Sequence, residues 1–101
     1  MRVTGYRALT TQHRWGRAVG DANGAFTDGV VPVQLVVVDT DEGVSGVGLG
    51  PHVGLDTVFP AVEGEDPRSV TALYDRMLRR TFKAGHAGAV FGTIGAIDTA
   101  L

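Results

Sequence analysis

The chain has 101 residues, 44% of them hydrophobic, which is sufficient for one domain with a modest core. Its net charge of −2 and isoelectric point of about 5.8 argue against binding to nucleic acid or a membrane surface, because both partners require a basic surface. The sequence has no cysteine, no apolar run near the roughly 20 residues of a membrane span and no signal-peptide core. We therefore expect a cytoplasmic protein without disulfides or thiolate-bound metal.

Three antiparallel strands and a long loop are predicted in the first half of the chain. Residues 2–9 alternate loosely between apolar and polar and predict the first strand. Residues 11–29 have no periodicity and are rich in glycine, so we expect a long loop there. Residues 33–40 are mostly β-branched and predict the clearest strand, which a turn at residues 40–43 joins to a returning strand at residues 44–49.

Helices are predicted in the second half. A helical turn is expected over residues 55–62, and Asp66 followed by Pro67 is typical of a helix start, with a carboxylate cap before a proline. We expect Gly85 to end this helix and a final helix to begin near Ala87. The first helix has an apolar stripe at Val70, Leu73, Tyr74, Met77, Leu78 and Phe82, and a charged face at Arg68, Asp75, Arg76, Arg79 and Arg80. Strands followed by helices predict an α+β fold, a three-stranded antiparallel meander followed by a small helical bundle.

The final helix, over residues 88–101, has almost no polar face. A helix of this kind lies in the interior of a larger structure, and its last carbonyl groups need partners that no following residue supplies. We therefore expect residues 1–101 to form a single domain of a longer protein, with much of the function carried outside it.

Residues 46–50, with glycine at every second position, have the first part of a dinucleotide-binding motif. That motif requires a third glycine three residues after the second, at the start of a helix. Here position 51 is proline and the segment closes a strand, so we interpret these glycines as sites of close backbone packing.

Candidate ligand contacts lie in the glycine-rich loops. The histidines His13, His52 and His86 lack the spacing of a metal site, but each lies in such a loop, where binding residues are common. Each is therefore either a surface or hydrogen-bonded residue or a ligand contact.

The segment from His13 to Arg17 is the sharpest polar group in the sequence. Arg14 and Arg17 flank Trp15, and guanidinium groups match carboxylates and phosphates. The alternative is a tryptophan packed on the sheet beside solvated arginines. Farther along the loop, Asp21 and Asn23 are either turn residues or hydrogen-bond partners of a polyol. The sequence contains no nucleophile–base pair, and we identify no catalytic residue in it.

Four segments carry a resemblance to a known family: residues 33–43, a V-x-V-x-T-D-x-G-like hairpin; 46–50, a glycine-rich strand end; 62–67, an L-x-G-x-D-P-like segment; and 92–101, an A-I-x-A-I-D-x-A-L-like helix. In this order and spacing they resemble the N-terminal capping domain of the enolase superfamily, in its mandelate racemase and muconate lactonizing enzyme branch. The chain departs from the family pattern at Gly50, where glutamate is usual, and in the short interval between Gly50 and Asp66.

The resemblance implies a division of labour between two domains. A catalytic (β/α) barrel, expected to follow this chain and to be its partner, holds Mg²⁺ on three carboxylates and provides Lys or His bases that take the proton next to a substrate carboxylate. The capping domain closes the barrel mouth with two mobile loops, which correspond here to residues 12–29 and 50–54. The resemblance therefore implies Mg²⁺ as cofactor, with no metal ligand in this chain.

The resemblance also indicates which residues face the substrate. The candidates for substrate selection are His13, Arg14, Trp15, Arg17, Asp21, Asn23 and His52. Lys83 and His86, in the connector at residues 82–86, either contact the barrel mouth or belong to a plain link between helices.

The expected function is that of a sugar-acid dehydratase, a lyase, because the arginines and the Asp21/Asn23 pair suit a polyhydroxylated acid. A racemase or cycloisomerase of the same superfamily is the alternative. Two further alternatives are a non-catalytic module that binds an anionic small molecule through Arg14, Trp15 and Arg17, and a truncated product without activity. We expect a homo-oligomer.

Overall fold

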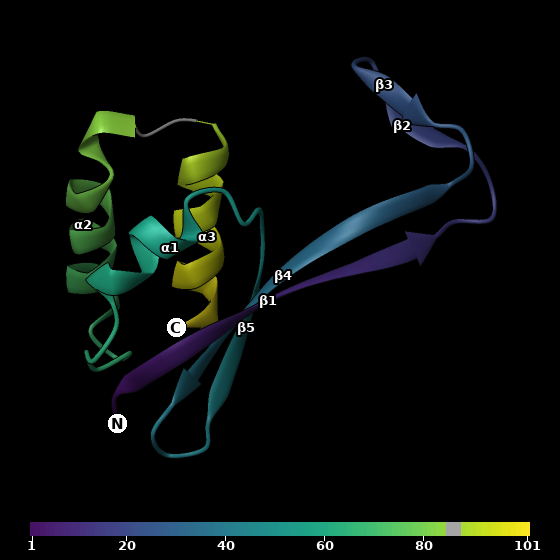
Figure 1. Ribbon diagram of the computed structural model, residues 1–101. Coiled ribbons are helices and arrows are strands. Elements are labelled where there is room, and N and C mark those ends of the chain that lie inside the picture. Colours follow the sequence, from purple (N-terminus) through teal and green to yellow (C-terminus); the bar gives the residue numbers. More distant parts are fainter. Residues whose placement is uncertain (85–87) are drawn as a thin grey trace.

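The computed structural model describes residues 1–84 and 88–101 (Figure 1). Strands occupy the first half and helices the second, which confirms the predicted α+β fold with a three-stranded antiparallel sheet. The strands are β1 (Val3–Arg14), β2 (Val19–Asp21), β3 (Gly24–Phe26), β4 (Val30–Thr40) and β5 (Ser45–Leu49). The helices are α1 (Leu55–Val58), α2 (Val70–Arg80) and α3 (Ala89–Ala100), with the 3-10 turns η1 (Phe59–Ala61) and η2 (Phe82–Ala84). No described helix is long and apolar enough to cross a membrane.

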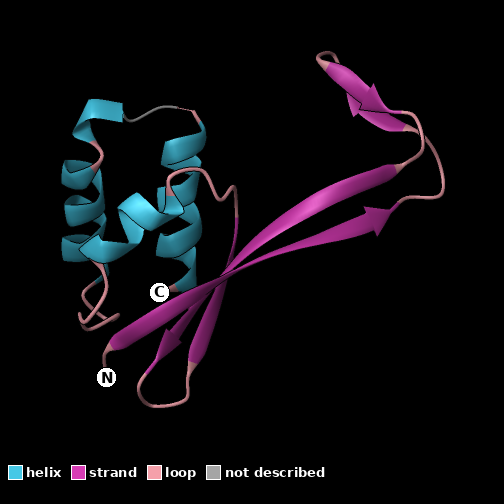
Figure 2. Ribbon diagram, viewed as in Figure 1, coloured by secondary structure: helices cyan, strands magenta, loops and turns pink. Residues whose placement is uncertain are grey.

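Strand β4 lies at the centre of the sheet, between β1 and β5, and both pairings are antiparallel. Strand β5 pairs with only the second half of β4, from Leu35 to Asp39. The first half of β4, before Leu35, pairs with β1 alone. There the two strands form a ribbon that extends away from the helices and carries the small β2/β3 hairpin at its end (Figures 1 and 2). We call this end, residues 13–29, the ribbon tip.

Proline is accommodated inside β4 because of this uneven pairing. The Gly50 N–H donates to the Gln34 carbonyl over 3.0 Å, so the backbone groups of Gln34 face the β5 side of the strand. Pro32, two residues earlier, faces the same side. Strand β5 ends opposite Leu35, so no neighbouring strand requires an N–H from Pro32.

Helix α3 packs directly on β5 through small residues. A side chain on Gly46 would collide with the Ala100 carbonyl, and one on Gly48 would collide with the Ala96 carbonyl. This arrangement confirms the interpretation of residues 46–50 as sites of close backbone packing. Only glycine on the strand, facing alanine on the helix, allows two backbones to approach so closely.

The core lies between the sheet and the helices. The Tyr6 ring from β1 contacts the Phe59 ring, with centroids 4.6 Å apart. The fully buried side chains of the core are Val3, Val36, Val38, Val58, Val62, Leu73, Met77, Ile94 and Ile97. They come from β1, β4 and all three helices, as well as the segment after η1, so this single core orients the loops that join these elements.

The prediction of a long loop at residues 11–29 was wrong in part. Strand β1 extends to Arg14, and two short strands form the hairpin at the ribbon tip. The reason is that every β1 residue from Arg7 onward is exposed, so the ribbon has no buried face to impose an apolar alternation on the sequence. Backbone pairing with β4 holds the strand without that signal.

The predicted start of the first long helix was also wrong. Helix α2 begins at Val70, because the Asp66 carboxylate accepts hydrogen bonds from the Arg68 backbone and guanidinium in a turn before the helix. Phe82 leaves the apolar stripe and is 67% exposed, because the chain tightens at Thr81 into the 3-10 turn η2. The predicted stop at Gly85 lies outside the described residues.

Candidate functional site

At the base of the ribbon tip, the two chain segments are held together closely. The Trp15 N–H donates to the Gly29 carbonyl over 2.8 Å, and Gly29 has a φ of 72°, a conformation that favours glycine. The His13 ring lies edge-on to the Trp15 ring, with centroids 4.8 Å apart. The structure thus brings together the histidine and tryptophan that the sequence placed in one segment, and it leaves Trp15 52% exposed.

Arg14 and Arg17 differ from the other arginines in the described part of the chain. Neither guanidinium group has a hydrogen-bond or ion-pair partner among the described residues, and both residues are exposed. By contrast, Arg2, Arg7, Arg68, Arg76, Arg79 and Arg80 each donate to a carboxylate or a backbone carbonyl. The ribbon tip therefore exposes two guanidinium groups without partners among the described residues, next to an exposed aromatic ring. This combination is suited to binding an anion.

Asp21 is the last residue of β2, and Asn23 lies in the turn between β2 and β3. The Asn23 N–H donates to the Asp21 carboxylate over 2.8 Å, which is an Asx-turn and supports the interpretation of these residues as turn formers. Both side chains are exposed at the end of the ribbon. Their contact with a polyol stays a prediction.

The second predicted loop, residues 50–54, lies between β5 and α1. The imidazole of His52 is half-buried, and its Nε2 lies 2.9 Å from the Leu35 carbonyl of β4. Val53 is the exposed side chain of the loop, at 52%. Thr93 of α3, which the sequence did not single out, contacts this loop through its hydroxyl group. The available signal was a hydroxyl within the apolar run at residues 89–97.

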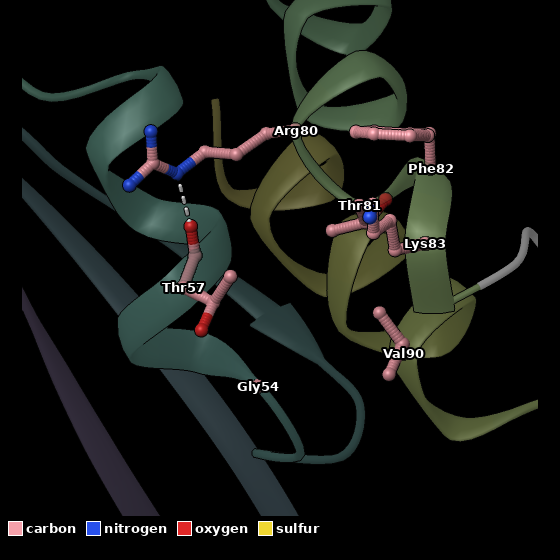
Figure 3. A pocket seen from close by; sticks show the side chains of 7 residues that line it. All are labelled: Gly54, Thr57, Arg80, Thr81, Phe82, Lys83 and Val90. Atoms are coloured by element: carbon pink, nitrogen blue, oxygen red, sulfur yellow. Dashed lines mark hydrogen bonds between the residues drawn. The ribbon is translucent and has the colours of Figure 1, made fainter.

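A pocket of about 370 Å³ joins this loop to the end of α2 (Figure 3). Gly54 of the loop and Lys83 of η2 both line it. The 50–54 loop and the connector after α2, which the sequence analysis treated as separate candidate segments, therefore meet at this pocket. Arg80 reaches across to α1, where its Nε donates to the Thr57 carbonyl over 2.5 Å. The Lys83 ammonium lies 5.9 Å from the centre of the Phe82 ring. His86 lies outside the described residues.

The two carboxylates with a lowered pKa, those of Asp39 and Asp66, have structural partners. Hydrogen bonds from Arg7 and Ser45 hold the pKa of Asp39 below its usual value, and hydrogen bonds from Arg68 hold the pKa of Asp66 well below the usual range. Asp39 and its partners lie on the sheet, and Asp66 and Arg68 lie in the turn before α2. Neither group belongs to the ribbon tip or the 50–54 loop. Within residues 1–84 and 88–101, no group of three or more His, Asp or Glu side chains could hold a metal ion.

No protein-family model matches the chain. A curated relative, a D-xylonate dehydratase from Haloferax volcanii, is 33% identical over 89 residues. The alignment covers 82% of this chain but 22% of the relative, so the chain spans about a fifth of the length of that protein.

Solved structures share the fold of nearly the whole chain. An L-talarate dehydratase from Polaromonas sp. JS666, in complex with Mg and L-glucarate, matches with a TM-score of 0.80 and 23% identity, covering 98% of this chain and 30% of that one. A 3,6-anhydro-D-galactonate cycloisomerase from Zobellia galactanivorans has a TM-score of 0.78 and 21% identity, covering 99% and 27%. A mandelate racemase/muconate lactonizing enzyme-like protein from Rubrobacter xylanophilus has a TM-score of 0.80 and 20% identity, covering 97% and 28%.

Proposed function

Because the chain resembles an N-terminal domain of mandelate racemase/muconate lactonizing enzyme-like members of the enolase superfamily, we propose that it is the capping and substrate-selecting domain of such an enzyme. The complete protein would remove the proton next to the carboxylate of a sugar acid and act as a dehydratase. The catalytic barrel would follow residues 1–101 and would be the partner that this domain covers. The neighbours support an enzyme as the full-length protein, since they include dehydratases and a cycloisomerase.

The observation that carries the proposal is the pair of unpaired arginines at the ribbon tip. Arg14 and Arg17 stand beside the exposed Trp15 and have no carboxylate partner among the described residues. A sugar acid offers a carboxylate for a guanidinium fork and hydroxyl groups for neighbouring polar side chains such as those of Asp21 and Asn23. Loops that cover a barrel mouth are suited to such selection, because they exclude water as they bind the substrate.

Mg²⁺ enters this proposal through the barrel and not through this chain. The described residues hold no cluster of ligands for it, whereas a solved neighbour is described as complexed with Mg. The domain's own contribution is therefore to bind and orient the substrate and to limit its access to water.

The second candidate function is that of an isomerase of the same superfamily. It is favoured by the cycloisomerase neighbour, which matches this chain as completely as the dehydratase does. The exposed arginines suit an acid in either case, so the products of the reaction distinguish the two functions.

The proposal is tested by replacing Arg14 or Arg17 with alanine in the full-length enzyme. Loss of a charge-assisted contact to the substrate is expected to lower kcat/KM for the preferred sugar acid by roughly 10- to 100-fold, mostly through KM. The matched control is Arg79→Ala, which removes an exposed arginine of α2 whose partner is Asp75. Product analysis of the wild-type reaction separates dehydration from isomerisation. An unchanged profile over a panel of sugar acids in both tip variants would contradict the role of the ribbon tip.

A further inference from the structure

The 50–54 loop is attached to the sheet at its beginning. The Gly50 N–H donates to the Gln34 carbonyl over 3.0 Å, and His52 Nε2 lies 2.9 Å from the Leu35 carbonyl. Both acceptors belong to β4 just where β5 ends, so the loop continues the hydrogen bonding of the sheet after the strand has finished. One of these contacts uses the side chain of a residue that the sequence marked as a ligand candidate.

Thr93 attaches the other side of the loop to α3. Its side chain is fully buried, and its hydroxyl oxygen lies 2.6 Å from the Val53 carbonyl and 3.1 Å from the Pro51 carbonyl. The Ala89 carbonyl, within the same helix, is 3.2 Å away. The shortest of the three contacts goes to the loop, so the hydroxyl proton is directed out of the helix.

Close packing adds to this attachment. A Cβ atom on Gly92 would lie 3.0 Å from the Cγ of Pro51, so the proline ring rests against the backbone of α3. Gly54, which ends the loop, has a φ of 69° and lies in the left-handed region. The loop is therefore attached at several points, which differs from the mobile loop that the resemblance implies for residues 50–54, and its Val53 side chain is exposed.

We infer that Thr93 is a positioning residue that fixes the 50–54 loop as a preformed wall of the substrate site and so sets the place of Val53. That the 50–54 loop contacts the substrate rests on the proposed function. The attachment of the loop to Thr93 does not depend on that function. Thr93 touches the loop backbone and acts on the substrate only through it.

The test uses the full-length protein with Thr93→Val, which keeps the shape of the side chain and removes the donor. Thr93→Ser restores the hydroxyl, and Thr93→Ala carries the test if the valine variant does not fold. The matched control is Thr99→Val, on the same helix, because among the described residues the Thr99 hydroxyl donates within α3, to the Gly95 carbonyl at 2.8 Å. Hydrogen exchange by mass spectrometry follows the peptide that contains the Leu55 amide, whose acceptor is the His52 carbonyl.

In the valine or alanine variant we expect the loop amides to exchange about tenfold faster or more, since a buried hydrogen bond that holds the loop is lost. The serine variant and the Thr99 control are expected to stay within about twofold of wild type. For the acid that the enzyme prefers, KM is expected to rise by roughly 5- to 20-fold while kcat changes by less than about threefold, because uniform binding is removed.

Exchange that is unchanged in both donor-free variants would overturn the inference. Faster exchange with unchanged KM would overturn the positioning role, since the loop would then lie outside the site. A wild-type protein that acts on no acid would overturn the proposed function instead, and the exchange comparison would still decide whether Thr93 fixes the loop.

Discussion

At the scale of single residues, the arginines of the described part of the chain fall into two groups, those with a hydrogen-bond or ion-pair partner and those without one. Arg7 donates to Asp39 through two guanidinium nitrogens, at 2.8 and 3.0 Å, and so joins β1 to β4. Ser45 of β5 donates to the same carboxylate over 2.6 Å, so one acid connects all three strands. Arg14 and Arg17 have no such partner in the described part of the chain, and the proposed function assigns them to the substrate.

Asp39 contributes to the acid side of the stability profile, together with Asp66, because the folded protein lowers the pKa of both carboxylates. The hydrogen bonds from Arg7 and Ser45 lower the folded-state pKa of Asp39 below 3.8, so their stabilisation is fully present above that pH and is lost as the pH falls through the folded pKa. Asp39→Asn should therefore flatten the loss of stability below about pH 4. Urea unfolding of wild type and variant at several pH values measures this. Asp56→Asn, at an exposed position in the first turn of α1, is measured beside it as the control for the removal of a surface carboxylate. Parallel profiles for wild type and Asp39→Asn would contradict the role of Asp39.

At the scale of elements, the fold depends on the contact between β5 and α3. Gly48→Ala places a Cβ against the Ala96 carbonyl, so the helix must move away from the sheet. We expect a loss of roughly 1–3 kcal/mol in the free energy of unfolding, typical of overpacking. The matched control is Gly95→Ala, on α3, where a Cβ would meet no described atom outside the helix backbone within 4 Å. That change should stabilise the protein by about 0.5–1 kcal/mol, because glycine is unfavourable within a helix. Equal stabilities of the two variants would contradict the close approach of β5 and α3.

The elements that could be predicted from the sequence are those whose pattern reports a buried face. The sequence predicted β4 from its β-branched residues and α2 from its apolar stripe. It also predicted the turn at Gly43, which has a φ of 76°. The outer part of β1 and the ribbon-tip hairpin were not, because their residues are exposed and backbone pairing alone leaves no periodic signal.

The candidate site could also be predicted only in part. The 50–54 loop could be located from its glycines, whereas the segment predicted as the other loop contains the end of β1 and the β2/β3 hairpin. The partners of individual side chains could not be predicted, because they depend on residues distant in the sequence. The contact of His52 with Leu35 and that of Thr93 with Val53 are examples, separated by 17 and 40 positions.

At the scale of the whole molecule, the protein consists of a packed body and an extended two-stranded ribbon. The helices and the three-stranded half of the sheet form the body, and the ribbon carries the tip away from it (Figure 2). Two-stranded ribbons are only marginally stable alone, so we expect the outer part of β1 and β4 to rest on another domain in the complete protein. A catalytic barrel, which the proposed function requires, would provide that surface.

The most direct test of the proposed function is to follow the proton next to the carboxylate of a sugar acid by ¹H NMR. The full-length protein is incubated in D₂O with Mg²⁺ and a panel of sugar acids, with and without a chelator. Loss of the signal of that proton from at least one acid, only while Mg²⁺ is present, is the predicted result for either a dehydratase or an isomerase. Retention of the signal in every acid by a folded, Mg²⁺-supplied protein would contradict the assignment of this chain to a proton-abstracting enzyme.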